Sequence, residues 1–122
     1  MTDQTILSQL RDHLGEERST NMFDVLEPAL IQQARDRVRK IENLVIAEGG
    51  KIDGVDERLT LADERESIIE TLHDISQRRE EKIMMYAKYP EITTNVDRML
   101  PHERKLYQDV RSAVLVYREA CR

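Results

Sequence analysis

Glu70 and His73 form a pair whose residue types and spacing could bind a metal ion in this 122-residue chain. A Glu-x-x-His pair on a helix places both side chains on one face, as in carboxylate-bridged di-iron sites. Such a site needs a second pair and two further glutamates, but neither His13 nor His102 follows a glutamate by three residues. Zinc is disfavoured too, because the chain has one cysteine and scattered histidines. We expect a solvent-facing pair, with no metal and no cofactor.

A second enzymatic interpretation is a small all-α enzyme of the chorismate mutase type. That family's opening is superficially similar to Ile52, Asp53, Asp56, Leu59 and Arg65, and its later Arg-Glu pair to Arg79 and Glu80. The family also needs a lysine one helical stretch after the arginine, where this chain has Ser76. The interval from Arg65 to Arg79 is too short for the helix and loop between them. This enzyme remains an alternative, and no catalytic residue is assigned.

A third interpretation is a helical nucleic-acid-binding module, suggested by four basic residues close together: Arg35, Arg37, Arg39 and Lys40. Helical spacing spreads them over a broad face, and Asp36 and Glu42 lie among or just after them. Ion pairs on a solvated face explain this pattern more simply. No aromatic residues are interleaved for base stacking. The formal net charge of −5 also argues against a general phosphate-binding protein, so any DNA contact is expected to be weak or indirect.

The elements that position these residues are expected to be long helices. Only four glycines and three prolines punctuate the chain, and 35% of its residues are charged. This composition argues against a β-sandwich, a barrel or a glycine-rich nucleotide-binding fold. The length fits one domain, residues 1–122. We therefore predict an all-α, four-helix bundle-like domain with one overlong helix and no sheet.

Apolar periodicity locates the four helices. They are predicted over residues 3–14, from 27 or 28 to the glycines at 49–50, over 59–88, and from 101 to the C-terminus. A break is predicted over 15–21, a loop over 49–56 and a linker over 91–98. Phe23, in the short segment 22–26, should enter the core. The apolar stripe of the last helix is predicted to be Leu106, Val110, Ala113, Tyr117 and Ala120.

Two runs depart from an amphipathic pattern, because residues 83–87 and 113–117 are apolar throughout. Five consecutive helical residues sweep more than a full turn, so such a helix must be covered on all sides. Two helices that cross there could bury both sides within one chain. We favour a surface for a partner protein. Its expected residues are Met84, Met85, Leu115 and Val116.

The segment 75–87 followed by 99–103 resembles the GINS family of DNA replication proteins. It is similar to the archaeal subunit class whose helical domain comes first. That class has an Arg-x-x-Lys-Ile helix with a following Ala, matched here by Arg79, Lys82, Ile83 and Ala87, and a Met-Leu-x-x-Glu entry to the last helix, matched by Met99, Leu100 and Glu103. Upstream, residues 17–19 before the segment 22–26 resemble the family's first connection. Members usually carry a small β-rich domain after the last helix, and the 122 residues contain none.

The resemblance implies a non-enzymatic scaffold subunit of a tetrameric complex, homomeric or mixed. Its partners would be other GINS subunits, the MCM helicase and a RecJ-like protein, and the apolar runs would form contacts between subunits. Arg79 lies four residues from Ile75 and from Ile83, so we expect a partly buried, paired guanidinium. Glu103, in the first turn of the last helix, is its candidate partner. Arg79, Lys82 and Glu103 are thus expected to be structural.

The expected setting is cytoplasmic, with association with the chromosome at the replication fork following from the resemblance. Cys121 is the only cysteine, so no intramolecular disulfide is possible. The N-terminal residues show no basic segment followed by an apolar run, and no apolar run exceeds five residues. We therefore predict a soluble intracellular protein without a signal peptide or a membrane span.

Overall fold

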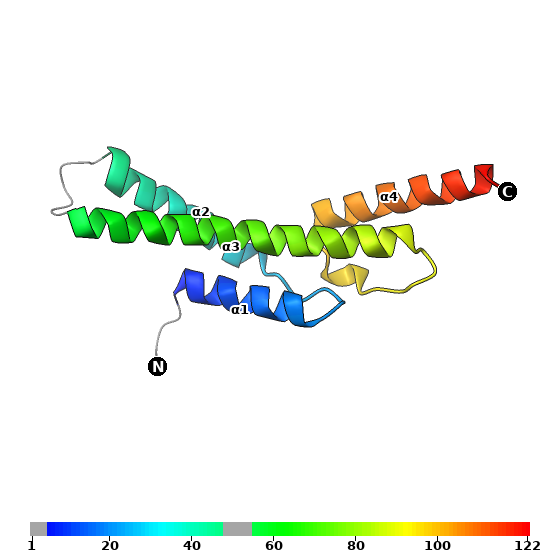
Figure 1. Ribbon diagram of the computed structural model, residues 1–122, viewed down its shortest axis with the longest axis horizontal. Coiled ribbons are helices and arrows are strands. Elements are labelled where there is room, and N and C mark those ends of the chain that lie inside the picture. The colour runs from blue at the N-terminus through cyan, green and yellow to red at the C-terminus, as the bar shows by residue number, and fades with distance from the viewer. Residues whose placement is uncertain (1–4, 48–54) are drawn as a thin grey trace. The chain divides into compact units, whose positions relative to one another are not determined.

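The structure, a computed structural model, describes residues 5–47 and 55–122, which form four α-helices and no strand (Figure 1). The all-α prediction is confirmed. The helices are α1 (Ile6–Ser19), α2 (Pro28–Glu42), α3 (Val55–Lys88) and α4 (Pro101–Ala120). A π-helical stretch, Asn43–Ala47, extends α2, and a 3₁₀ turn, Val96–Arg98, precedes α4.

Helix α1 continues through Gly15 to Ser19, so the predicted break over 15–21 was wrong for its first five residues. A mid-helix glycine costs only about 1 kcal/mol relative to alanine. Tertiary contacts offset this cost, because Glu17 in the added turn is fully buried and ion-paired. The Ser19 hydroxyl also donates to the carbonyl of Glu16 at 2.9 Å. The predicted start at Asp3 lies outside the described residues.

Helix α3 begins at Val55, four residues before the predicted start, and ends at Lys88 as predicted. Asp56 and Glu57 lie in its first turn, where negative charge interacts favourably with the helix dipole. Its 34 residues correspond to about 50 Å at 1.5 Å per residue, so the prediction of one overlong helix is confirmed. The predicted end of the second helix at Gly49–Gly50 lies outside the described residues.

The chain divides into two compact units, residues 1–14 with 27–74 and residues 15–26 with 75–122. Helices α1 and α3 each contribute to both. In the first unit, Ala34, Ile41 and Ile68 are buried, and two ion pairs link α2 to α3: Arg37–Glu64 at 2.7 Å and Arg65–Glu42 at 3.1 Å. That the whole chain acts as a single domain stays a prediction.

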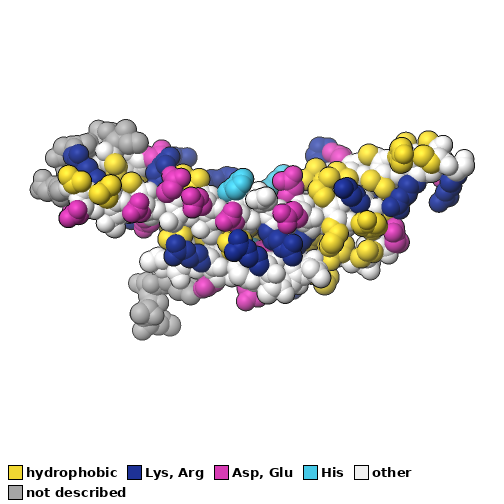
Figure 2. Space-filling view, in the orientation of Figure 1, with side chains coloured by type: hydrophobic (Ala, Val, Ile, Leu, Met, Phe, Trp, Pro, Cys, Tyr) yellow, Lys and Arg dark blue, Asp and Glu magenta, His cyan; other side chains and the backbone are white. Residues whose placement is uncertain are grey.

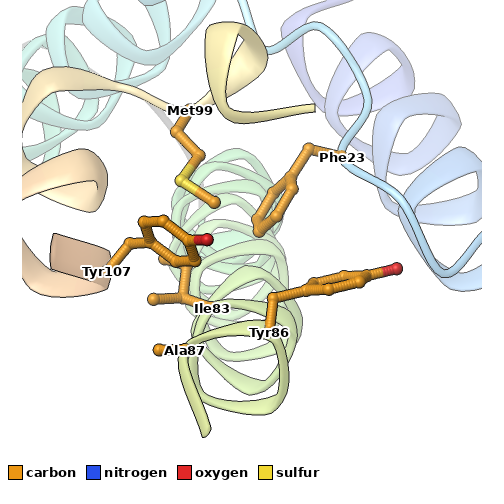
Figure 3. Close-up of a cluster of buried hydrophobic side chains, with 6 residues drawn as sticks. All are labelled: Phe23, Ile83, Tyr86, Ala87, Met99 and Tyr107. Carbon is orange, nitrogen blue, oxygen red and sulfur yellow. The ribbon is translucent and has the colours of Figure 1, made fainter. Parts of the chain in front are cut away.

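The second unit is built around six buried side chains, shown in Figure 3: Phe23, Ile83, Tyr86, Ala87, Met99 and Tyr107. Phe23 is buried as predicted, although the residues beside it, Met22 and Asp24, are less so. The amide side chain of Asn95 fixes the backbone of Phe23. Its oxygen accepts from the Phe23 N–H at 3.0 Å, and its nitrogen donates to the Phe23 carbonyl at 2.7 Å. The segment 20–27, which has no regular secondary structure, is therefore held in part by side-chain hydrogen bonds to its backbone.

The buried face of α4 differs from the predicted stripe. Glu103 and Tyr107 are buried, and Val110 and Val114 are half-buried. The predicted stripe residues Leu106, Ala113, Tyr117 and Ala120 are exposed. The reason is that an ionised side chain, Glu103, starts the buried face, which apolar periodicity does not reveal. In addition, the last turns of α4 contribute no residue to the buried cluster of Figure 3, and Val116 and Tyr117 are about 70% exposed.

Candidate functional site

A cluster of four ionisable side chains lies inside the second unit. Two are acidic and two basic, so their formal charges cancel: Glu17, Arg79, Lys82 and Glu103. Arg79 is 1% exposed and Glu17 is 0% exposed. They come from the end of α1, from adjacent turns of α3 and from the first turn of α4. Burial of this kind is tolerated only where every charge is paired and hydrogen-bonded.

Arg79 is the centre of the cluster. Its guanidinium donates to both oxygens of Glu103, from Nε and from Nη2, at 2.8 Å each. Nη1 donates to Oε1 of Glu17 and, at 2.9 Å, to the carbonyl of Asp24. Nη2 also donates to the carbonyl of Arg98 at 2.9 Å. The planar fork of arginine suits such two-pronged contact with a carboxylate, and lysine could not replace it.

Lys82 completes the charge balance one turn further along α3. Its ammonium donates to the second oxygen of Glu17 and to the carbonyl of Met22, the latter at 2.7 Å. Both cations also lie over the face of the Phe23 ring, with Arg79 at 5.2 Å and Lys82 at 5.9 Å from its centroid. This cation–π geometry connects the charges to the apolar cluster of Figure 3.

Glu103 has a second role at the start of α4. Its Oε1 accepts the backbone N–H of Leu100 at 2.8 Å, which satisfies a donor at the helix N-terminus. Within the part of the chain that the structure describes, no buried side-chain nitrogen or oxygen lacks a hydrogen-bond partner. The hydrogen bonds of the four side chains are therefore directed to one another and to the backbone around them.

The protonation of Arg79 reflects two opposing effects. Desolvation by burial lowers its pKa, but the hydrogen bonds and negative charges of Glu103 and Glu17 outweigh it, and the pKa is raised overall. Because the pKa of Arg79 is higher in the folded than in the unfolded chain, the charged guanidinium stabilises the fold. This stabilisation is complete at pH values below the unfolded-state pKa and is lost only as the pH rises through the folded-state pKa. Arg79 therefore remains charged throughout the neutral range, and we assign this cluster a structural role.

The sequence led us to expect a partly buried Arg79 paired with Glu103, and this ion pair is present. The guanidinium is more deeply buried than expected. Reasoning from the sequence missed Glu17, because it lay in the predicted break. A signal did exist: Glu17 follows Leu10 and Leu14 by seven and three residues, so it continues the buried stripe of α1.

The residues expected to form an interface are mostly uncovered. Met84 is half-buried and Met85 is exposed. Both line a shallow groove that runs along one side of α3 and is bordered by Gln77, Glu80, Glu81, Lys88 and Tyr89. The described chain alone leaves this groove open.

The second half of α4 is uncovered as well. Leu115 is exposed, and Val116 and Tyr117 are 71% and 70% exposed. Figure 2 shows hydrophobic side chains gathered over this end of α4. Arg118 is the contact that anchors it, donating to the carbonyl of Lys88 at 2.7 Å. Neighbouring apolar side chains exposed on one helix are typical of a surface that another protein covers.

The residues that suggested metal or enzyme chemistry do not assemble. Glu70 and His73 are both exposed, and no three His, Cys, Asp or Glu side chains within residues 5–47 and 55–122 are grouped to hold a metal ion. Arg65 pairs with Glu42, and Arg79 is enclosed by carboxylates. Ile52 and Asp53, part of the likeness to chorismate mutase, lie outside the described residues.

The basic residues of α2 are partly used within the first unit. Arg37 pairs with Glu64 of α3, and Arg39 lies 4.0 Å from Asp36. Arg35 and Lys40 are exposed. This mixed pattern fits a solvated helix face better than a track for phosphates, which needs several uncommitted cations.

Comparison of the chain with known protein families, curated proteins and solved structures finds no match. In the described ranges, no helix combines the length and the apolar content needed to cross a membrane.

Proposed function

We propose that this protein is a non-enzymatic scaffold subunit of a GINS-like DNA replication complex, which links the replicative MCM helicase to a RecJ-like protein. Helical surfaces make its contacts. Two surfaces are available for these contacts. One is the groove beside Met84 and Met85, and the other is the exposed end of α4 around Leu115 and Val116. The protein acts at the replication fork in the cytoplasm and has no substrate of its own.

The exposed end of α4 carries this proposal. Val116 and Tyr117, neighbours on the last turns, each leave about 70% of their surface in solvent. Transfer of apolar surface out of water contributes about 25 cal/mol per Å², so this surface favours association with another protein. The all-α architecture and the Arg79–Glu103 ion pair at the entry to α4 are compatible with the family resemblance.

The test is direct binding of the purified chain to an MCM helicase and to a RecJ-like nuclease of archaeal type, by surface plasmon resonance. We expect Val116→Glu and Met85→Lys each to weaken binding about tenfold or more, because Met85 lines the apolar groove and Val116 lies on the surface through which subunits assemble. Gln108→Glu on α4 and Ser76→Glu on α3 are the matched controls. Both positions are exposed and polar, so these variants should bind as the natural chain does.

Circular dichroism must show that each variant keeps its helix content. Failure of the folded natural chain to bind either protein would refute the proposal. Equal binding by all four variants would also refute it, because the apolar surfaces would then be irrelevant to the contact.

A further inference from the structure

The exposed face of α4 repeats every seven residues. Leu106, Ala113 and Ala120 follow one another at this interval, and Val116 and Tyr117 lie between the last two on the same side. All five are exposed. A seven-residue apolar repeat is the pattern of helices that pack along their length against another helix. The small side chains at two of the three repeat positions allow a close approach.

A charged flank runs beside this face with the same interval. Lys105, Ser112 and Glu119 are seven residues apart, so they lie along one edge of the apolar stripe. The outer two are exposed, and each forms an ion pair with a residue close by in the sequence: Lys105 with Asp109 at 3.2 Å and Glu119 with Arg122 at 3.6 Å. The flank is therefore basic near the start of α4 and acidic near its end.

We propose that α4 pairs with α4 of a second copy of this chain in an antiparallel, two-fold symmetric contact centred near Ala113. The inference rests on the proposed function and deepens it by naming the occupant of the α4 surface. In an antiparallel pair, the same flank of both helices meets. Lys105 then lies beside Glu119 of the second copy, and Glu119 lies beside its Lys105. In a parallel pair, opposite flanks of the two helices would meet, so Lys105 and Glu119 would have no such contact with each other.

The apolar face fits the same arrangement. With Ala113 at the two-fold axis, Leu106 lies opposite Ala120 of the second copy, so a large side chain meets a small one. The two Ala113 residues meet at the centre. Asp109, the polar residue within the face, lies opposite Tyr117, whose hydroxyl can donate to its carboxylate. A surface that complements itself in shape and in charge is what a two-fold dimer requires.

The test is sedimentation equilibrium of the chain at low salt. We expect a dimer at micromolar concentration. Lys105→Glu and Glu119→Lys should each weaken dimerisation about tenfold, because each substitution turns two attractive contacts of the dimer into two repulsive ones. The double variant K105E/E119K should dimerise as the natural chain does. An equimolar mixture of the two single variants should also recover dimers, because each copy then supplies the charge that the other lacks.

Val116→Glu should abolish the dimer whatever the salt concentration, whereas the losses caused by the charge reversals should shrink at high salt. The three substituted positions, Lys105, Val116 and Glu119, all lie on exposed surface, so helix content measured by circular dichroism should stay unchanged. A chain that is monomeric at all concentrations would overturn the proposal. Single charge-reversal variants that dimerise as tightly as the natural chain would overturn it too. If Lys105 contacts Glu119 of the second copy, reversal of either charge must weaken the dimer.

These outcomes separate the inference from the proposed function. A monomer that still binds the helicase or the RecJ-like protein would refute the α4 pair and leave the scaffold role intact. A dimer with the charge dependence described here that binds neither protein would support the pair and refute the scaffold role.

Discussion

Replacement of Arg79 by methionine should be the most damaging single change in the second unit. The substitution keeps most of the side-chain volume but removes the donors to Glu17 and Glu103 and to the carbonyls of Asp24 and Arg98. One buried carboxylate, Glu103, then loses the guanidinium that contacts both of its oxygens, and Glu17 loses one of its cationic contacts but keeps Lys82 and the backbone N–H of Asp24. Removal of one partner from a buried ion pair costs about 3–5 kcal/mol. We expect a loss in this range, against a total stability of about 5–15 kcal/mol for a typical domain.

Urea unfolding followed by circular dichroism at 222 nm measures this loss. The matched control is Arg78→Met, because Arg78 is half-exposed, pairs with Glu81 at 3.6 Å and donates to two carbonyls at 3.4 Å. The control should cost under about 1 kcal/mol. The double variant R79M/E103M removes a cation and an anion together and leaves the pair of Lys82 with Glu17. It should lose less than the sum of its two single variants, with a coupling of about 1–3 kcal/mol.

A loss of less than about 1 kcal/mol in the free energy of unfolding for Arg79→Met would refute the reasoning, because a buried carboxylate without its cation should destabilise the fold by more than that. Additivity of Arg79→Met and Glu103→Met would refute it as well. In that case the two side chains would contribute independently, in spite of their double hydrogen bond.

Three further predictions follow from local geometry and chemistry. Gly15→Ala should stabilise the chain by about 0.5–1 kcal/mol in the same unfolding experiment, because a Cβ at this helical position meets no neighbouring side chain or segment within 4 Å. A destabilisation would contradict the helical placement of residue 15. Asn95→Ala should cost about 1–3 kcal/mol through two hydrogen bonds to Phe23, whereas the exposed Thr93→Ala should be neutral, and equal effects would contradict the bridging role. The purified chain should not consume chorismate, and turnover in a spectrophotometric assay would restore the enzymatic alternative.

Most of the helices could be predicted from the sequence, because their apolar residues recur at the helical period and their ends carry recognisable signals. Pro28 and Pro101 mark helix starts, and α3 ends just before Pro90. The start of α3 and the end of α1 could not be predicted in the same way. Gly15 looked like a stop signal, but the buried contacts of Glu17 in the following turn outweigh the weak helix propensity of a single glycine.

The charge cluster was only half predictable. Arg79 drew attention because it interrupts an apolar stripe between Ile75 and Ile83, and Glu103 because it starts a helix. Glu17 continues the stripe of Leu10 and Leu14, but only across Gly15, which looked like a helix end. The carbonyls of Met22, Asp24 and Arg98 that accept hydrogen bonds have no side-chain signal at all. The exposure of Leu115 and Val116 depended on where the core stops, which periodicity within α4 does not reveal.

The charge cluster constrains how this protein can change over generations. Glu17, Arg79, Lys82 and Glu103 come from three helices, yet replacement of any one by a neutral residue leaves the buried cluster with an unbalanced net charge. A neutral route from this arrangement to an apolar one must pass through at least one intermediate of much lower stability. In descendants and relatives of this chain, we therefore expect these four positions to be inherited as a set or exchanged together, while the sequence around them drifts.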